Sequence, residues 1–445
     1  MRLLIAPNVA NPYDQRMVEG LAAGFRVLGH EAIAVPGPLT EIDAAPVCKQ
    51  LDLDVLIQVN KFRPLYAALP EKVRHITWFQ DVFPETLTDA ALIKSTDIVY
   101  ALGDPKVLGL NTALPCYVGT LLTGIDDSTL AMDHLAADAP IDMSLCGYIP
   151  TPYVVHRAPS EDLLWYVYDT LRRIPVLGRM RGIRGILRVL SRTSLPIGYA
   201  PYAVTTTLRS TVEALYRPLR GELDIYALER AMREVVAPVL AQQARPKARP
   251  RKPAASGRLS LILLPYEKAP HVIQPELESL INWFARDYPR LLDRHLLLQN
   301  LLTVSDDLEL YGPGWDKHEE FRPYHKGTIV LQSELLQVYR RSRLNLANNT
   351  HGLGLHARTL ECMAVGGFIF THTSANDDKP GGLETSFEPG VHYGTYTPDS
   401  IADDARRWLG DEQARAVAGK RAAQIIREKH LWRHRAEQIL NDLGR

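Results

Sequence analysis

The sequence has few of the features that mark secreted, membrane-spanning or dinucleotide-binding proteins. Its four cysteines are scattered with no CxxC spacing, which argues against a disulfide framework or a zinc ribbon. No apolar run approaches the ~20 residues needed to span a bilayer. No GxGxxG motif follows the first predicted strand and there is no Walker A sequence, which disfavours dehydrogenases and NTPases. Because the segment MRLLIAP shows no signal-peptide pattern, we expect a cytoplasmic protein.

The chain also lacks an excess of charge of either sign, since 51 Lys+Arg balance 51 Asp+Glu. We therefore expect no nucleic acid partner. The charges are nevertheless uneven, because residues 157–258 hold 19 Lys+Arg against 8 Asp+Glu. The hydrophobic content of 46% is ordinary for a globular protein, and 445 residues are too many for one core, so we expect two or more domains.

Short apolar segments alternate with helical ones over residues 1–135. The predicted strands are 3–7, 32–35, 55–59, 75–79, 98–101 and 116–118, and the first predicted helix is 14–28. This alternation predicts an α/β fold with a parallel, doubly wound sheet. Ligands bind beyond the carboxyl ends of such strands. Asn11 and Asn60 lie near those ends, so we expect them in a cleft.

A second α/β unit is predicted from residue 139 onward. Its strands are 143–146, 308–311, 344–347 and 368–371, followed by a helical tail over 398–443. Between these strands, residues 155–305 read as a basic, mainly helical insertion, with a Pro- and Arg-rich linker at 245–258. The predicted domains are therefore 1–138, 139–430 with this insertion, and a terminal helix at 431–445.

Residues 344–371 hold the most informative motif: a buried strand, a loop with glycines, a short helix and a second buried strand. The N-terminus of such a helix presents N–H groups and a positive dipole end to an anion. Arg358 adds a fork that suits phosphate, and Glu361 adds an acceptor that suits sugar hydroxyls. The alternative is an i,i+3 ion pair on a surface helix. We favour a sugar-nucleotide site, because the flanking strands place the helix at a sheet edge.

Two further motifs follow the predicted strand 308–311. The sequence Tyr311-Gly-Pro-Gly-Trp315 makes a tight turn at a carboxyl end. Either its backbone approaches a nucleotide, or the turn is structural and Trp315 lies in the core. Lys326 either meets a phosphate or a base-binding loop, or lies in a solvated turn.

Asp81 follows the strand 75–79 in the sequence His-Ile-Thr-Trp-Phe-Gln-Asp. A carboxylate at the end of a strand could deprotonate a hydroxyl group as a general base. The alternative is that Asp81 caps the helix that begins near Pro84, a role that aspartate fills well. Both interpretations remain open.

The segment 174–192 places Arg181, Arg184 and two further arginines on one helical face and apolar residues on another. Basic amphipathic helices bind acidic membrane surfaces, so peripheral membrane contact is one interpretation. A core-packed helix with a solvated arginine face is the other, and we favour it slightly. Metal patterns are weak: the Asp-Leu-Asp sequence at 52–54 lies at the start of a strand, and His430 and His434 lack a third ligand. We expect no metal.

With these motifs in view, the chain resembles GT-B glycosyltransferases, most closely the CgeB-like branch of the group 1 glycosyltransferases. Five sequence features carry the resemblance, in order along the chain. They are Trp-Phe-x-Asp at 78–81, Asp-x-Ser-x-x-Gly at 142–147, Tyr-Gly-x-Gly-Trp at 311–315, Lys-Gly at 326–327, and Arg-x-x-Glu at 358–361 before Gly-Gly at 366–367. The part from residue 308 onward matches best, and 155–305 is not covered.

The resemblance implies two Rossmann-like domains that face a central cleft, with no metal and no cofactor. A nucleotide-diphosphate sugar would bind mainly on the second domain. A glycan, lipid or protein acceptor would bind mainly on the first, where Asn11 and Asn60 are the expected cleft residues and Asp81 is the candidate catalytic base. The last helices would cross back onto the first domain. The expected donor-binding residues are Gly147, Tyr148, Tyr311, Gly312, Gly314, Trp315, Lys326, His351, Gly352, Gly354, Arg358 and Glu361.

One position departs from the family pattern. Related retaining enzymes grip the donor with an E-x7-E pair, and Glu361 is similar to its second, ribose-binding glutamate. The first position is Leu353, which cannot take that role. The donor-sugar contacts and the stereochemistry therefore stay open.

We predict a glycosyltransferase that moves a hexose-type sugar to a hydroxyl acceptor. A nucleotide-sugar epimerase of the same fold is the first alternative, and it would act on the donor without any acceptor. A non-catalytic nucleotide-sugar-binding or scaffold protein is the second, because the first glutamate is missing.

Overall fold

The computed structural model describes residues 1–63, 69–80, 93–110, 113–131, 140–151, 196–244 and 270–444. The chain divides into two compact units. One comprises Met1–Ile149, Pro218–Leu223 and Leu292–Arg445, and the other comprises Pro150–Arg217 and Asp224–Leu291. The first unit contains two parallel sheets, whereas the described part of the second is helical.

The first sheet has six strands in the order β2-β1-β3-β4-β5-β6, and every pairing is parallel. The strands are β1 (Arg2–Ala6), β2 (Glu31–Ala34), β3 (Val55–Val59), β4 (Arg74–Phe79), β5 (Ile98–Ala101) and β6 (Tyr117–Thr120). Strand β3, with the sequence VLIQV, is buried at every position. Such a nearly continuous apolar strand is what a parallel sheet covered on both faces requires. The order reverses between β1 and β3, which is where ligands bind in sheets of this type.

Helix α1 (Pro12–Val27) covers one face of this sheet and buries Met17, Leu21 and Phe25. Asn11 begins it as an N-cap, because its Oδ1 accepts a hydrogen bond from the backbone N–H of Asp14 at 2.8 Å. The other helices in the described residues of this part are α2 (Glu41–Gln50) and the short α3 (Asp127–Ala131).

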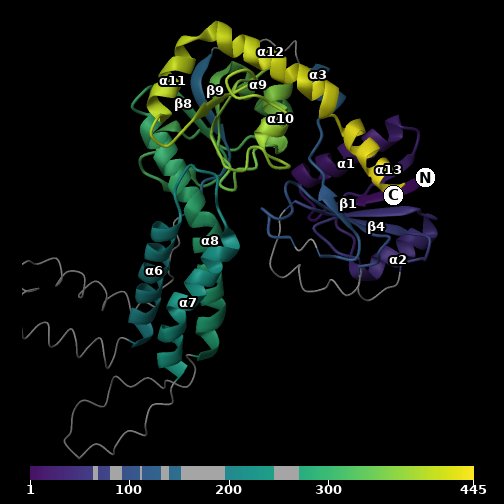
Figure 1. Ribbon diagram of the computed structural model, residues 1–445, viewed down its shortest axis with the longest axis horizontal. Coiled ribbons are helices and arrows are strands. Elements are labelled where there is room, and N and C mark those ends of the chain that lie inside the picture. The colour runs from purple at the N-terminus through teal and green to yellow at the C-terminus, as the bar shows by residue number, and fades with distance from the viewer. Residues whose placement is uncertain are drawn as a thin grey trace, which may run out of the picture. The chain divides into compact units, whose positions relative to one another are not determined.

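The C-terminal helix α13 (Trp432–Leu443) lies beside α1 in the same core (Figure 1). The Trp432 ring packs edge to face on Trp78, with 6.2 Å between the ring centroids. The Tyr100 hydroxyl donates a hydrogen bond of 2.7 Å to the Asp442 carboxylate. The end of the chain is thus part of the core built on the first sheet.

The second sheet has five parallel strands in the order β11-β10-β9-β7-β8. They are β7 (Ile141–Cys146), β8 (Leu308–Tyr311), β9 (Ser342–Ala347), β10 (Ile369–His372) and β11 (Gly394–Tyr396). Taken in chain order, this is the order of the first sheet without its last strand. The reversal here lies between β7 and β9.

The helices of this second α/β part are α9 (Gln332–Arg341), α10 (Ala357–Ala364), α11 (Ile401–Gly410) and α12 (Glu412–Lys429). Short 3-10 turns lie at η6 (Trp315–Lys317), η7 (Arg322–Tyr324) and η8 (Leu383–Thr385). Helix α10 buries Leu360, Cys362 and Met363 in a core that Ala422 and Ile426 of α12 complete. This packing fixes the direction in which α10 points its N-terminus.

The second unit contains α6 (Pro196–Leu215), α7 (Ile225–Ala244) and most of α8 (Pro270–Leu301). The Tyr288 hydroxyl on α8 donates to Glu213 on α6 at 2.6 Å. Arg233 on α7 forms an ion pair of 2.6 Å with Glu278 on α8. Within the part of the chain that the structure describes, no helix combines the length and apolar character needed to cross a membrane.

The predicted fold class is confirmed: the chain is α/β, with two Rossmann-like parallel sheets and additional helices. All ten predicted strands are present within two residues of their expected starts, and among the strands of the described residues only β11 was not predicted. The last turns of α8, which the sequence placed in the insertion 155–305, belong to the unit that holds the sheets. The basic segment 174–192 and the linker 245–258 lie outside the described residues. The predicted domain boundaries stay predictions.

Candidate functional site

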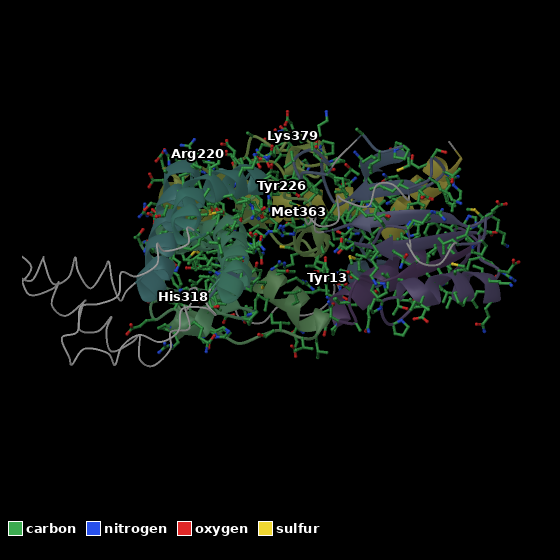
Figure 2. The ribbon with its side chains drawn as sticks, turned by 90° about the horizontal axis from the view of Figure 1, so that it is seen from below. Tyr13, Arg220, Tyr226, His318, Met363 and Lys379 are labelled. Atoms are coloured by element: carbon green, nitrogen blue, oxygen red, sulfur yellow. The ribbon has the colours of Figure 1, made fainter. Side chains whose placement is uncertain are left out.

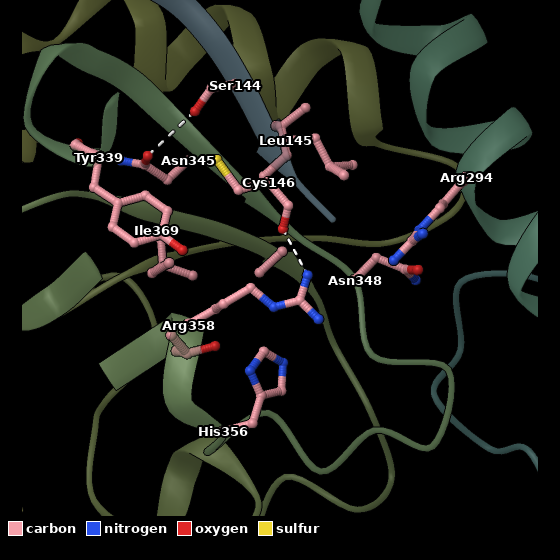
Figure 3. A pocket seen from close by; sticks show the side chains of 13 residues that line it. Ser144, Leu145, Cys146, Arg294, Tyr339, Asn345, Asn348, His356, Arg358 and Ile369 are labelled. Carbon is pink, nitrogen blue, oxygen red and sulfur yellow. Dashed lines mark hydrogen bonds between the residues drawn. The ribbon is translucent and has the colours of Figure 1, made fainter. Parts of the chain in front are cut away.

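A pocket opens at the carboxyl ends of β7 and β9, where the order of the second sheet reverses (Figure 3). In a doubly wound sheet this is the place where a ligand is expected. Its walls come from β7, β9, β10, the N-terminus of α10 and the last turns of α8. The lining residues are Ser144, Leu145, Cys146, Arg294, Tyr339, Asn345, Leu346, Ala347, Asn348, His356, Arg358, Thr359 and Ile369.

Arg358 brings positive charge to this pocket from the first turn of α10. Its Nη1 donates a hydrogen bond of 2.7 Å to the carbonyl oxygen of Cys146, at the end of β7. A guanidinium group has five N–H donors. One of them fixes the side chain, and the side chain as a whole is exposed, so the remaining donors can meet a ligand. The N-terminal end of α10 adds the partial positive charge of the helix dipole.

Gly147 makes room for two guanidinium groups at this point. A Cβ atom at position 147 would lie 2.7 Å from Nη1 of Arg358 and 3.3 Å from Nη2 of Arg294. Both distances are tighter than normal carbon contacts, so a larger residue would push the arginines away. The absence of a side chain at Gly147 therefore brings two positive charges to the strand end.

Arg294 reaches the pocket from α8, and Figure 3 shows its guanidinium group directed into the same space as that of Arg358. It stacks over the ring of Tyr148, with 5.2 Å between the guanidinium carbon and the ring centroid. Such a cation–π contact holds the side chain in place. The neighbouring Asp293 accepts a hydrogen bond of 3.1 Å from the Asn348 amide and fixes the loop after β9.

His356 is the N-cap residue of α10 and lines the same pocket. Burial, together with the positive charge of Arg358, lowers the pKa of His356 to about 3. The imidazole is therefore neutral at pH 7, when it can donate one hydrogen bond and accept another.

The turn after β8 serves packing. Trp315 is 0% exposed, and its indole N–H donates to the carbonyl oxygen of Gly147 at 2.7 Å. Gly312 and Gly314 have φ values of 118° and 97°, and a Cβ at Gly312 would lie 2.6 Å from that same oxygen. The buried indole agrees with the structural interpretation of this turn. Tyr311 donates its hydroxyl proton to Glu309 at 2.6 Å, and donor contacts of the turn stay predictions.

The loop after β9 contains His351, Gly352 and Gly354, and it is tied to neighbouring loops. The Asn376 amide donates to the carbonyl oxygen of His351 at 2.8 Å. Gly352 has a φ of 74°, and a Cβ there would clash with the carbonyl oxygen of Gly221 and the hydroxyl oxygen of Ser374. A Cβ at Gly354 would lie 2.6 Å from Leu383. These glycines allow loops to approach one another closely.

Glu361 does not share the pocket of Arg358. It lines a separate small pocket, together with Tyr13, Arg16, Met17, Thr123, Gly124, Ile125, Asp126, Thr129, Gln332, Ala357 and Trp432. The Glu361 side chain accepts a hydrogen bond of 3.1 Å from Gln332. Burial raises the pKa of Glu361, an effect that the positive charge of Arg16 opposes. Its ribose contact stays a prediction.

The remaining predicted residues lie elsewhere. Lys326 is exposed, and its backbone N–H donates to the carbonyl oxygen of Leu310 at 2.9 Å, beside β8. Asn11 caps α1, and Asn60 has a φ of 53° and accepts a hydrogen bond of 2.7 Å from the backbone N–H of Gln80. Asp81 lies outside the described residues.

Of the predicted donor residues, the structure brings Gly147, Tyr148 and Arg358 together at the arginine pair, and the turn with Tyr311, Gly312 and Trp315 packs against Gly147. Sequence reasoning missed Arg294, because it lies in the stretch taken as an insertion. Its position on α8, directly after a buried aspartate, gave no local signal of a ligand site.

The second α/β part is similar in sequence to a known family. Residues 290–441 match the family model described as "Glycosyl transferase-like". This segment is about a third of the chain and includes Arg294, Arg358 and Glu361. No curated protein matches the chain.

Several solved structures superpose on nearly the whole chain at low similarity. A glycosyltransferase from Rickettsia africae ESF-5 has 8% identity and a TM-score of 0.44, over 99% of this chain and 97% of its own. HepE from Anabaena, in complex with UDP-glucose, has 10% identity and a TM-score of 0.47, over 100% of this chain and 99% of its own. AviGT4, a glycosyltransferase involved in avilamycin A biosynthesis, has 10% identity and a TM-score of 0.48, over 100% of this chain and 97% of its own. Likenesses at this level carry no conclusion about function.

Proposed function

We propose that the protein is a glycosyltransferase of the GT-B type that moves a sugar from a nucleotide-diphosphate sugar to a hydroxyl acceptor. The observation that carries the proposal is the arginine pair at Gly147, inside a segment similar to glycosyl transferases. Two guanidinium groups and a helix N-terminus at the reversal point of a parallel sheet form a site for a diphosphate.

The chemistry that these groups supply is stabilisation of the leaving group. As the bond between the sugar and the diphosphate breaks, negative charge grows on the departing oxygen atoms. Donors fixed in advance around that charge stabilise the transition state more than the ground state. Arg358 is fixed by the Cys146 carbonyl, and Arg294 is fixed by the Tyr148 ring. Two fixed positive charges can take the part that a metal ion plays in other transferases, which supports a metal-independent reaction.

The first test measures the binding of UDP, GDP and dTDP by calorimetry, followed by transfer assays with the corresponding sugars. We expect one of the nucleotides to bind. Arg358→Ala removes a charge-assisted interaction that contributes about 1.5–3 kcal/mol, so the affinity should fall about 10- to 150-fold. The turnover number should fall by about a hundredfold or more, because the developing charge loses a fixed donor.

Arg294→Ala should have a smaller effect in the same assays, since Arg358 remains beside the helix dipole. Arg406→Ala is the matched control: Arg406 is exposed on α11 and pairs with Asp403 at 2.8 Å, away from the pocket. Unchanged nucleotide affinity in Arg358→Ala would remove this arginine from the site. Conversion of the donor without any acceptor would instead indicate an epimerase, and binding of no nucleotide would indicate a scaffold.

A further inference from the structure

Three potential metal ligands that the proposed reaction does not use meet near the end of α8. His295 lies on the last turns of α8, and His318 and Glu320 follow the turn η6. Nε2 of His295 is 3.2 Å from Nδ1 of His318, which is labelled in Figure 2. Nδ1 of His295 is 3.2 Å from Oε1 of Glu320. One ligand atom from each of the three residues lies within 4.8 Å of the other two.

We propose that these three side chains bind a divalent transition metal ion of the zinc class. Zinc in proteins is held by imidazole nitrogen and carboxylate oxygen atoms at about 2.0–2.2 Å in tetrahedral geometry. Two nitrogen ligands on such an ion lie about 3.4 Å apart, by that same geometry. The observed separation of 3.2 Å between the imidazoles is close to this value. Glu320 contacts the other ring nitrogen of His295, Nδ1, so its side chain must turn toward the ion to supply the third ligand, with water as the fourth.

The environment of the cluster suits a metal ion. The His295 side chain is partly buried, with 26% of its surface exposed. His318 is buried, with 5% of its surface exposed, whereas the Glu320 side chain is 47% exposed. An ion can therefore enter from the side of Glu320 and meet two imidazoles that are already in place.

Aromatic side chains support the two histidines. The Phe321 ring lies 4.9 Å from that of His295 and packs on Trp315 at 6.0 Å, each measured between ring centroids. Trp315 in turn donates its hydrogen bond to Gly147. A metal ion here would join the end of α8, which carries Arg294, to the turn that holds the Gly147 backbone. Its role would be structural, separate from the handling of the diphosphate.

The test is titration of the full-length, metal-stripped protein with zinc chloride, followed by calorimetry and by metal analysis after dialysis. We expect one zinc ion per chain and a higher melting temperature with zinc than without it. His318→Ala and His295→Ala should abolish this binding. Glu320→Gln replaces a half-exposed carboxylate with a group of the same shape, and should weaken zinc affinity at least about tenfold.

His392→Ala is the matched control, because His392 lies in the same α/β part and accepts a hydrogen bond of 2.9 Å from the backbone N–H of Glu388. This variant should bind zinc like the unmodified protein. Zinc binding that is absent, or equal in Glu320→Gln, His295→Ala and the unmodified protein, would overturn the proposal. The cluster would then be a hydrogen-bonded chain from Glu320 through His295 to His318. Folding of Glu320→Gln is checked by its circular dichroism, and nucleotide binding is measured separately without zinc.

Discussion

The two parallel sheets share one strand order but present different chemistry at their carboxyl ends. In each sheet the first strand lies between the second and the third, as β2-β1-β3 and β8-β7-β9. After β1 and β3, the side chains of Asn11 and Asn60 accept hydrogen bonds from backbone N–H groups. After β7 and β9, Arg358 and Arg294 meet at Gly147, and Arg358 keeps donors for a ligand.

The difference shows that a shared strand order determines where a ligand can bind, at the carboxyl edge of the sheet. It does not by itself supply the side chains that bind the ligand. A polar side chain that completes a helix cap or a turn has committed part of its hydrogen-bonding capacity to the backbone. A guanidinium group fixed by one bond to a carbonyl keeps further donors and its full charge. Among the described residues, the second sheet therefore carries the clearer binding chemistry, although both sheets reverse at equivalent positions.

The substitution Gly147→Ala tests this contrast most directly and should have the largest effect. The new methyl group would displace Nη1 of Arg358, which is the far end of a flexible side chain. The fold should therefore keep its stability within about 1 kcal/mol, whereas nucleotide affinity should fall about 10- to 150-fold, as for loss of one charge-assisted contact. Calorimetry and urea unfolding measure the two effects.

Gly410→Ala is the control for Gly147→Ala. A Cβ at Gly410, at the end of α11, would meet no atom within 4 Å. This variant should match the unmodified protein in affinity and stability. If Gly147→Ala retained full nucleotide affinity, the arginine pair would not be the diphosphate site, and the contrast between the sheets would lose its main support.

A second prediction concerns a property that the two sheets share, histidines whose pKa is lowered so that they are neutral at pH 7. Burial lowers the pKa of His75 in β4 and of His356 at α10 to about 3 each. Between pH 6.5 and 3 the unfolded chain binds protons at these residues and the folded chain does not, so stability falls as the pH drops. At pH 5 each histidine should lower the free energy of unfolding by about 2 kcal/mol relative to its value at pH 7.

His75→Gln should flatten this dependence by about that amount. Glutamine has no proton to gain, and its amide can replace the contact of 3.0 Å between His75 Nε2 and Gln58. Urea unfolding at pH 7 and pH 5 measures the slope for both proteins. An equally steep loss of stability in His75→Gln would mean that His75 is protonated in the folded state as well.

The sequence predicted the sheets well because each strand is a local signal. Runs such as VLIQV in β3 are apolar at nearly every position, and that pattern belongs to a strand buried on both faces. Strand β11 has only three residues, Gly-Thr-Tyr, which are too few to give a pattern. The candidate site depends instead on contacts between residues that are far apart in the sequence. Arg294 and Gly147 are far apart in the sequence, and only the packing of α8 brings them together.

The glycines of the loops after β8 and β9 show the same limit of prediction from the sequence. The family resemblance implied donor contacts for Gly312, Gly314, Gly352 and Gly354, while the sequence left the turn at 311–315 open between approach to a nucleotide and packing. Each of them lies against another segment of the protein, where a Cβ would clash. A glycine required for packing and a glycine required for binding look the same in a sequence, because both report only that a side chain is excluded.

The smallest expected effect belongs to Asn11, which was predicted to lie in the acceptor site or cleft and which caps α1. Asn11→Ala removes the hydrogen bond to the Asp14 N–H and should cost about 1 kcal/mol of stability. Asn11→Ser keeps a good cap, so its free energy of unfolding, measured in urea, should stay within a few tenths of a kcal/mol of that of the unmodified protein. If the side chain serves only as a cap, Asn11→Ser will also keep its KM for the acceptor. A raised KM for the acceptor in a variant of unchanged stability would assign Asn11 to the acceptor site and show that the first sheet, too, holds binding chemistry at its edge.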